Sequence, residues 1–544
     1  MHAASIRERA HTCGAFTAVG AVILVVLSGA SQGGMLWAQD RIELTVDASK
    51  SGAKIDRHIF GQFAEHLGSG VYEGIWVGPE SRIPNTRGIR NDVVAALRAL
   101  KVPNVRWPGG CFADDYHWRN GIGPRERRNV TLNPSWGGVL EPNSFGTHEF
   151  MDFLDQIGSE AYLSVNVGSG TPQEAADWLE YLTAAQPTTL AQERATNGHA
   201  APYKIPFLGI GNESWDCGGN MSAEAYLTQL RIYSRFVRNF NPAQQDRERM
   251  LKIAVGPGGG GEPRWTEWTE TIMKAWQGRQ WSWDIDGLSL HNYTVPRWPP
   301  SHASVGFGEA EYAQILQTTL RMEDMIATHS AIMDKYDPEK KVALAVDEWG
   351  AWYAPLPGSN PAFLVQQNSL RDAILASLNL NIFVRHADRV RIANIAQMIN
   401  VLQAMIITDQ EKLVLTPTYH VFRMYVPFQD ATFLPVTYTA GSYTHADVTL
   451  PRLDAIAAKD ASGTFWLALT NLDAGKPIEI VATLSGVTAK SATGTTLTAP
   501  RVDSINTFDA PTMVVPQPLT AAVRAGRVTV RLAPKSVTVI SVRP

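Results

Sequence analysis

Between residues 59 and 397, eight short apolar runs alternate with longer segments of helical character, and this alternation restricts the fold more than any other feature. The runs are β-branched or aliphatic and end in Gly, Pro or polar residues, as buried parallel strands do. They cover residues 59–63, 104–107, 162–167, 207–211, 253–256, 287–290, 342–346 and 390–395. Helices are predicted between them, for example over residues 92–100, 172–182, 223–240 and 312–336. The pattern predicts an α/β fold, a (β/α)8 TIM barrel, with an open doubly wound sheet as the alternative, because periodicity alone does not close a barrel.

The composition and the sequence pattern of the chain change near residue 408. Thr, Val, Ala and Pro become frequent, and turn residues separate short alternating stretches such as 465–470 and 527–532. This pattern predicts a C-terminal antiparallel β-sandwich of jelly-roll type. Residues 41–46 alternate in the same way and are expected to join that sandwich. We therefore predict a signal peptide over 1–38, a strand segment over 39–58, the barrel over 59–407 and the sandwich over 408–544.

The first residues of the chain resemble an export signal. Arg7 and Arg9 form a basic start, and the apolar run 15–27 is too short to cross a bilayer comfortably. Small residues follow, so cleavage is expected after Ala38, with Ala30 as the second choice. The prediction is a secreted or periplasmic protein, with an uncleaved N-terminal anchor as the alternative.

Composition restricts the class of partner. Charged residues make up 18% of the chain and the net charge is −4, so no strong positive field is available to hold nucleic acid or an anionic membrane. A neutral substrate fits this balance better than a polyanion. The 16 Trp are compatible with stacking on sugar rings, although most Trp residues simply fill a core. We expect no nucleic acid partner and no stable membrane insertion after signal cleavage.

Polar side chains collect at the ends of the predicted strands, where barrel active sites form. Glu213 closes the fourth predicted strand and Glu348 the seventh, and each is followed by a Trp within two residues. Glycoside hydrolysis needs two such carboxyl groups, one protonated and one charged. Proximity would raise the pKa of one of them and so supply the acid. A separation of roughly 5 Å would indicate retention of anomeric configuration, and a wider gap inversion.

Four spaced motifs resemble one enzyme family. Residues 60–68 (FGQFAEHLG), 105–112 (VRWPGGCF), 209–213 (GIGNE) and 346–349 (VDEW) are similar to those of the family 51 α-L-arabinofuranosidases. The resemblance covers the barrel from about residue 42 onward. It implies a barrel with catalytic glutamates on strands four and seven and a C-terminal β-sandwich, in agreement with the pattern of the chain.

The resemblance also implies roles for residues around the two glutamates. Glu213 would be the acid/base and Glu348 the nucleophile. Asn212 would bind the sugar 2-hydroxyl, a contact that strengthens as charge develops at the anomeric carbon. Arg106 would keep Glu348 ionised, and Tyr293 would orient it by a hydrogen bond.

Further residues are expected to line the sugar pocket. The resemblance places Glu65 and Cys111 around the terminal arabinofuranose and Gln397 on a sugar hydroxyl, and His291 is expected to contact substrate. Cys217, beside the acid/base motif, departs from the common family pattern. We predict a Cys111–Cys217 disulfide, because the exported chain would hold no other cysteine. A reduced Cys111 that faces the sugar is the alternative.

Two other patterns do not predict a cofactor. His66, His291 and Asp347 lack the spacing of a zinc site in a barrel hydrolase, so structural or substrate-contacting roles are preferred. The glycine-rich stretch 256–261 lacks the Lys-Ser or Lys-Thr of a phosphate loop. No metal or organic cofactor is expected, because the chemistry needs carboxylates and water alone.

Together these observations predict an exo-acting retaining α-L-arabinofuranosidase. Its partners would be arabinoxylan, arabinan or their oligosaccharides, from which it would release terminal non-reducing residues. Another retaining barrel glycosidase, such as an endo-glucanase or xylanase, is the first alternative and would need a long open cleft. A non-catalytic carbohydrate-binding protein is the second, and the presence of both glutamates argues against it. The assembly state is left open, with a homo-oligomer as one option.

Overall fold

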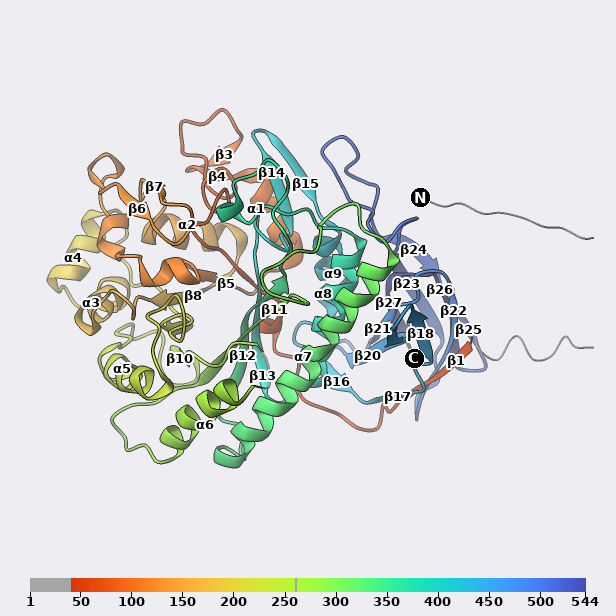
Figure 1. The fold of residues 1–544 in the computed structure, drawn as a ribbon. Helices are drawn as coiled ribbons and strands as arrows, with labels where there is room; N and C mark the ends of the chain where they lie inside the picture. Colours follow the sequence, from red (N-terminus) through yellow and green to blue (C-terminus); the bar gives the residue numbers. More distant parts are fainter. Residues whose placement is uncertain (1–40, 260–261) are drawn as a thin grey trace, which may run out of the picture. The chain divides into compact units, whose positions relative to one another are not determined.

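The computed structural model describes residues 41–544 except 260 and 261, so the predicted signal peptide over 1–38 lies outside the described residues. Figure 1 shows the ribbon of the chain. Among the residues that are described, no helix is both long enough and apolar enough to cross a membrane.

Eight parallel strands close into a barrel, as predicted. In chain order they are β2 (Gly61–Phe63), β5 (Asn104–Trp107), β8 (Glu160–Val165), β9 (Phe207–Ile210), β10 (Leu251–Ala254), β11 (Gly287–Thr294), β12 (Ala343–Ala351) and β13 (Val390–Ile395). The last strand returns to the first, because Asn394 of β13 pairs with Gly61 of β2. This closure excludes the open doubly wound sheet.

Two apolar layers hold the barrel. Inside it, five strands contribute the side chains of one small cluster: Tyr162, Phe207, Ile253, Ala345 and Ile392. Outside it, the opposite faces of the strands pack in one large core with the surrounding helices. Burial on both faces explains why the strands are almost continuously apolar in sequence.

Helices follow the barrel strands and cover them (Figure 1). They are α1 (Asn91–Leu100), α2 (Thr147–Ile157), α3 (Pro172–Thr183), α4 (Thr189–Thr196), α5 (Ala223–Phe236), α6 (Pro263–Gln277), α7 (Glu309–Tyr336) and α8 (Leu370–Arg385).

The helix predicted over 223–240 is wrong at its C-terminal end. Val237 already has extended backbone angles, and the Asn239 side chain accepts a hydrogen bond from the Asn241 amide just before Pro242. A local turn of this kind competes with helix continuation.

The C-terminal part forms two packed sheets of mostly antiparallel strands, as predicted. One sheet has the order β16-β20-β21-β27-β23-β24 and the other β17-β1-β22-β26-β25. The strands are β1 (Arg41–Val46), β16 (Thr432–Leu434), β17 (Val436–Tyr438), β20 (Leu453–Lys459), β21 (Phe465–Asn471), β22 (Ile478–Leu484), β23 (Ser491–Leu497), β24 (Gln517–Thr520), β25 (Ala522–Arg524), β26 (Arg527–Leu532) and β27 (Ser536–Arg543). β1 pairs parallel with β22 and antiparallel with β17. The inward side chains of both sheets form a separate core.

The barrel and the sandwich share buried polar contacts along α8. Ser377 hydrogen-bonds Thr470, and Asp454 accepts hydrogen bonds from Asn381 and Arg385. Between the two parts lie the hairpin β14 (Ile406–Asp409)–β15 (Lys412–Leu415) and α9 (Pro417–Tyr425). The boundary predicted after residue 407 falls within β14, and the division of the chain into domains stays a prediction.

Candidate active site

The turn after β9 carries Asn212 and Glu213 in a conformation that few residues adopt. Gly211 has φ 89° and Glu213 has φ 37°, both in the left-handed region. The Glu213 carbonyl accepts hydrogen bonds from the Asp216 amide at 2.7 Å and the Gly218 amide at 3.1 Å. A Cβ on Gly218 would lie 1.8 Å from the Asn212 carbonyl oxygen, so only glycine fits there. Left-handed backbone at a non-glycine residue is often found at functional sites.

We expect Gly218→Ala to lower kcat/KM on any substrate of this site by about 100-fold, because the new methyl group displaces the turn that aims Glu213, and a displacement of about 1 Å costs that much. The matched control is Gly278→Ala, whose Cβ would have only an ordinary contact of 3.6 Å. Kinetics of both variants on one substrate check the prediction. Wild-type kinetics in a folded Gly218→Ala variant would contradict it.

Strands β11 and β12 run further than the sequence pattern predicted, to Thr294 and Ala351 in place of 290 and 346. Their polar residues were expected just after the last residue of each strand. Instead the ladder shifts register between Ser289 and His291 and continues, with His291 paired to Glu348. This irregularity places His291 and Tyr293 beside Glu348 on neighbouring strands.

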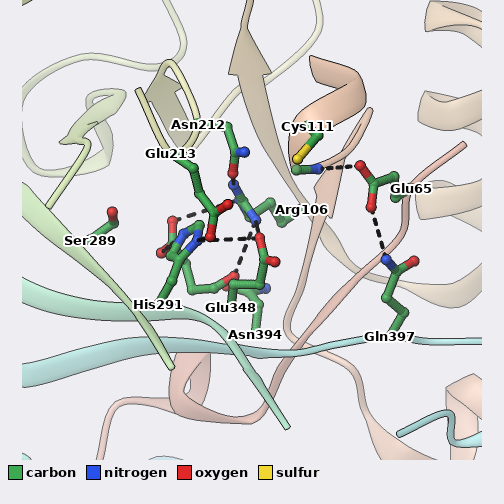
Figure 2. Close-up of polar contacts among 12 residues, drawn as sticks. Glu65, Arg106, Cys111, Asn212, Glu213, Ser289, His291, Glu348, Asn394 and Gln397 are labelled. Carbon is green, nitrogen blue, oxygen red and sulfur yellow. Dashed lines mark hydrogen bonds and ion pairs between the residues drawn. The ribbon is translucent and has the colours of Figure 1, made fainter. Parts of the chain in front are cut away.

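Glu348 is buried and held by two donors. Arg106 Nη1 lies 2.9 Å from Glu348 Oε2, and the Tyr293 hydroxyl donates to Oε1 at 2.6 Å. Arg106 also donates to Asn212 Oδ1 at 2.5 Å (Figure 2). The structure therefore contains both contacts that the resemblance implied for Glu348, and one guanidinium connects the strand-four and strand-seven motifs.

His291 connects three carboxylates. Its Nδ1 lies 2.9 Å from Glu213 Oε1 and 3.4 Å from Glu348 Oε2, and its Nε2 lies 3.2 Å from Asp347 Oδ1. Asp347 is buried and also accepts a hydrogen bond from the Tyr162 hydroxyl. The imidazole is thus held at both nitrogens, between the two catalytic candidates (Figure 2).

Burial and charge separate the pKa values of these groups. Burial raises the pKa of Glu213, and the Glu348 carboxylate raises it further, against the opposing effect of His291. Burial alone would lower the pKa of His291, but Glu348, Asp347 and Glu213 outweigh it and raise the value to about 10. Burial would raise the pKa of Asp347, yet Arg106 and His291 hold it below its ordinary value. Glu213 is therefore the carboxyl group suited to carry a proton.

One atom each from Glu213, His291 and Glu348 could face a metal ion, since these atoms lie within 4.8 Å of one another. A protonated imidazole has no lone pair to offer a metal. In this structure the Nδ1 atom of His291 instead lies at hydrogen-bonding distance from Glu213 Oε1, at 2.9 Å, so the ring is paired with the carboxylates.

Glu65 and Gln397 form a second polar group beside the first. Glu65 Oε1 accepts from the Gly110 amide at 3.0 Å and the Phe112 amide at 3.1 Å, and Gln397 Nε2 donates to Oε2 at 3.0 Å. Burial, assisted by the Glu348 charge, raises the pKa of Glu65 to about 7. Gly110 and Phe112 flank Cys111, so this group reaches the strand-two loop (Figure 2).

Cys111 forms a disulfide with Cys217, as predicted, and the alternative of a free Cys111 is wrong. The bond joins the loop after β5 to the loop after β9 across 106 residues of sequence. Cys217 Sγ lies 3.7 Å from Glu213 Oε2.

Three buried residues that hold the site were not among the predicted site residues. Asp347 and Tyr162 support His291, while Asp114 accepts hydrogen bonds from the Val167 and Gly168 amides and from the Asn212 amide. An available signal for Asp347 was its position next to Glu348 in an otherwise apolar strand. Asp114 follows the strand-two motif by two residues and gave no comparable signal.

A closed parallel barrel with two carboxyl groups facing each other at the carboxyl ends of its strands defines a barrel glycoside hydrolase. Two family models match the chain: "Alpha-L-arabinofuranosidase 1 domain" over residues 96–258 and "Alpha-L-arabinofuranosidase C-terminal domain" over residues 347–536. The chain belongs to the family 51 α-L-arabinofuranosidases, as the relatives described next also show.

Full-length relatives show the same family. An intracellular exo-α-L-arabinofuranosidase of Bacteroides ovatus is 44% identical, over 93% of this chain and 97% of the relative. An intracellular exo-α-(1→5)-L-arabinofuranosidase of Bifidobacterium longum is 30% identical, over 89% and 88%. The crystal structure of the family 51 arabinofuranosidase of Xanthomonas axonopodis pv. citri has 51% identity and a TM-score of 0.89, over 92% of this chain and 100% of that one.

The prediction of a secreted or periplasmic protein is wrong. The relatives from Bacteroides ovatus and Bifidobacterium longum, and another from Streptomyces lividans, are all named intracellular enzymes. The prediction depended on a basic start and a 13-residue apolar run over 15–27, and such a run does not by itself distinguish an export signal from another apolar segment.

Proposed function

We propose that the protein is an exo-acting, retaining α-L-arabinofuranosidase that removes terminal non-reducing α-L-arabinofuranosyl residues from arabinose-containing oligosaccharides. The observation that carries the retaining mechanism is the distance between the catalytic carboxyl groups. An oxygen of Glu213 and an oxygen of Glu348 lie within 4.8 Å of each other. Retaining glycosidases have a separation of roughly 5 to 5.5 Å, whereas inverting enzymes need roughly 6.5 to 9.5 Å to admit a water.

In this proposal the two glutamates divide the chemistry. Glu348 attacks the anomeric carbon, and Glu213 donates its proton to the departing glycosidic oxygen. Glu213 then takes a proton from water, which attacks the same carbon and releases arabinose and Glu348. Arg106 and Tyr293 orient Glu348 toward the anomeric carbon by their hydrogen bonds at 2.9 and 2.6 Å.

Asn212, Glu65 and Gln397 are the proposed sugar-binding residues. Asn212 is buried and oriented by Arg106, and its amide nitrogen donates one hydrogen to Cys217 Sγ at 3.8 Å, which leaves the second hydrogen for a 2-hydroxyl. Glu65 and Gln397 orient each other through one hydrogen bond. In this proposal their remaining hydrogen-bonding capacity serves sugar hydroxyls further from the reacting carbon. The names of the relatives support exo-action on arabinofuranosides within the cell and so favour short oligosaccharides as substrates. Which of arabinoxylan and arabinan is their source, and whether the chain assembles into homo-oligomers, stay predictions.

Hydrolysis of an aryl α-L-arabinofuranoside, followed by NMR of the first sugar released, tests the proposal. We expect the α anomer to form first and to mutarotate afterwards. An initial β product would contradict retention. No reaction on this substrate, together with a rapid fall in viscosity of a β-glucan or xylan, would favour an endo-acting barrel glycosidase instead.

The activity is expected to fall on the alkaline side as Glu213 loses its proton. Because its pKa is raised, the protonated form persists to higher pH than in an ordinary carboxyl group. His291 opposes that rise by hydrogen bond and charge, so His291→Asn is expected to move the alkaline limb of kcat/KM to higher pH. The matched control is His445→Asn, in the β18 (Ser442–His445)–β19 (Val448–Pro451) hairpin. An alkaline limb of His291→Asn that stays in place or moves to lower pH would contradict the prediction.

A further inference from the structure

The Cys111–Cys217 disulfide lies directly beside the proposed acid/base. One sulfur from each cysteine and one carboxylate oxygen of Glu213 lie within 4.8 Å of one another. Cys217 is exposed, while Cys111 and Glu213 are partly exposed. The bond is therefore open to reductants from solvent, and its reduction would change the chemistry at the acid/base itself.

Reduction would convert a weakly coordinating group into two strong ligands. A dithiol reductant transfers two electrons and two protons to the bond and becomes a disulfide, which leaves one thiol on Cys111 and one on Cys217. Thiolate and carboxylate ligands together suit Zn²⁺, which accepts three protein ligands and a water in tetrahedral geometry.

The spacing of the three ligands fits such a site. Zinc bonds of about 2.3 Å to sulfur and 2.0 Å to oxygen place the two ligand atoms about 3.5 Å apart in a tetrahedron. Cys217 Sγ and Glu213 Oε2 are already 3.7 Å apart. The two sulfurs must separate to about 3.8 Å by the same geometry, which breaking their bond allows. Cys111 Sγ, already within 4.8 Å of a Glu213 oxygen, must settle at about 3.5 Å from it.

The backbone around both cysteines is held independently of the disulfide. The amides of Gly110 and Phe112, on either side of Cys111, donate to Glu65. The amides of Asp216 and Gly218, on either side of Cys217, donate to the Glu213 carbonyl. The two thiols are therefore expected to stay near Glu213 after reduction, so that the ligand set is largely formed before a metal arrives.

We propose that reduction of this disulfide creates a Zn²⁺ site made of Cys111, Cys217 and Glu213, and that zinc bound there inhibits the enzyme. The coordinated Glu213 carboxylate can no longer carry the proton for the leaving group. The inhibitory part of the proposal rests on the proposed role of Glu213, whereas the metal site itself does not.

Metal binding is tested without any activity measurement. The full chain with Cys13→Ser, which retains only Cys111 and Cys217, is reduced with a phosphine, freed of reductant without oxygen and titrated with Co²⁺. We expect thiolate-to-cobalt absorption that saturates at one Co²⁺ per chain and is displaced by Zn²⁺. The oxidised protein is expected to show none of it, and Cys217→Ser in the same background to bind Co²⁺ at least tenfold more weakly. Equal absorption in both redox states, or no absorption after reduction, would overturn the site.

Activity on an aryl α-L-arabinofuranoside then tests inhibition. Excess Zn²⁺ is expected to lower the rate of the reduced enzyme at least tenfold, with recovery on chelation, and to leave the oxidised enzyme unchanged. Equal zinc effects in both states would overturn the proposal while leaving the arabinofuranosidase assignment intact. Stoichiometric Co²⁺ binding by a protein that hydrolyses no arabinofuranoside in either state would instead overturn the proposed function and keep the metal site.

Discussion

Replacing Glu348 with Ala is expected to lower kcat/KM on an aryl α-L-arabinofuranoside by about 10⁴-fold or more, the size of loss seen when a covalent nucleophile is removed. Without the carboxylate no glycosyl-enzyme forms, and the alanine leaves Arg106 and Tyr293 with no anion to hold at that position. The effect should appear in kcat, because the interaction that is lost belongs to the transition state.

Two control variants show whether this loss comes from the missing carboxylate of Glu348. Glu348→Gln keeps the side-chain volume, so a similar loss would exclude simple collapse of the site. Glu126→Ala removes an exposed carboxylate on the barrel surface and should leave the rate and Tm unchanged. Retention of more than one hundredth of wild-type activity by a folded Glu348→Gln protein would contradict the nucleophile assignment.

Glu213→Ala is expected to lower kcat/KM to different extents on two kinds of substrate. On an arabino-oligosaccharide, whose leaving alkoxide needs a proton, kcat/KM should fall by about 10² to 10⁴-fold. On an aryl glycoside with an acidic phenol, the first step needs little protonation and should lose less than about tenfold. The second step still lacks its base, so a burst of phenol followed by slow turnover is expected.

The pH profile of the same variant gives a second readout. Its alkaline limb should disappear on the aryl substrate, because that limb reports the proton on Glu213. Equal losses on both substrates with an unchanged profile would show that Glu213 acts structurally and not as the acid/base.

Much of the fold could be predicted because it depends on local patterns. The strand over 104–107 and that over 390–395 have the predicted bounds, since a strand buried on both faces needs a short, continuous apolar run. Both catalytic candidates could be found because each closes a predicted strand, at the end of a barrel where active sites form, and lies in a short contiguous motif. The end of α5 was missed, because a side-chain turn near Asn239 outweighs helical periodicity.

The arrangement of the site depended on closure of the barrel. Gln397 and Glu65 are 332 residues apart and touch only because β13 returns to β2. His291 lies between Glu213 and Asp347 because the β11–β12 ladder shifts register just before it, and no local pattern encodes such a shift.

The sequence by itself thus determined the class of fold, the family and the two glutamates, because each follows from periodicity or from short contiguous motifs. The tertiary structure decided which neighbours control them: His291 between Glu213 and Asp347, the Arg106 bridge between Asn212 and Glu348, and the Cys111–Cys217 bond. These are contacts between side chains from different strands and loops, and their distances exist only after the strands have taken up one register around a closed barrel.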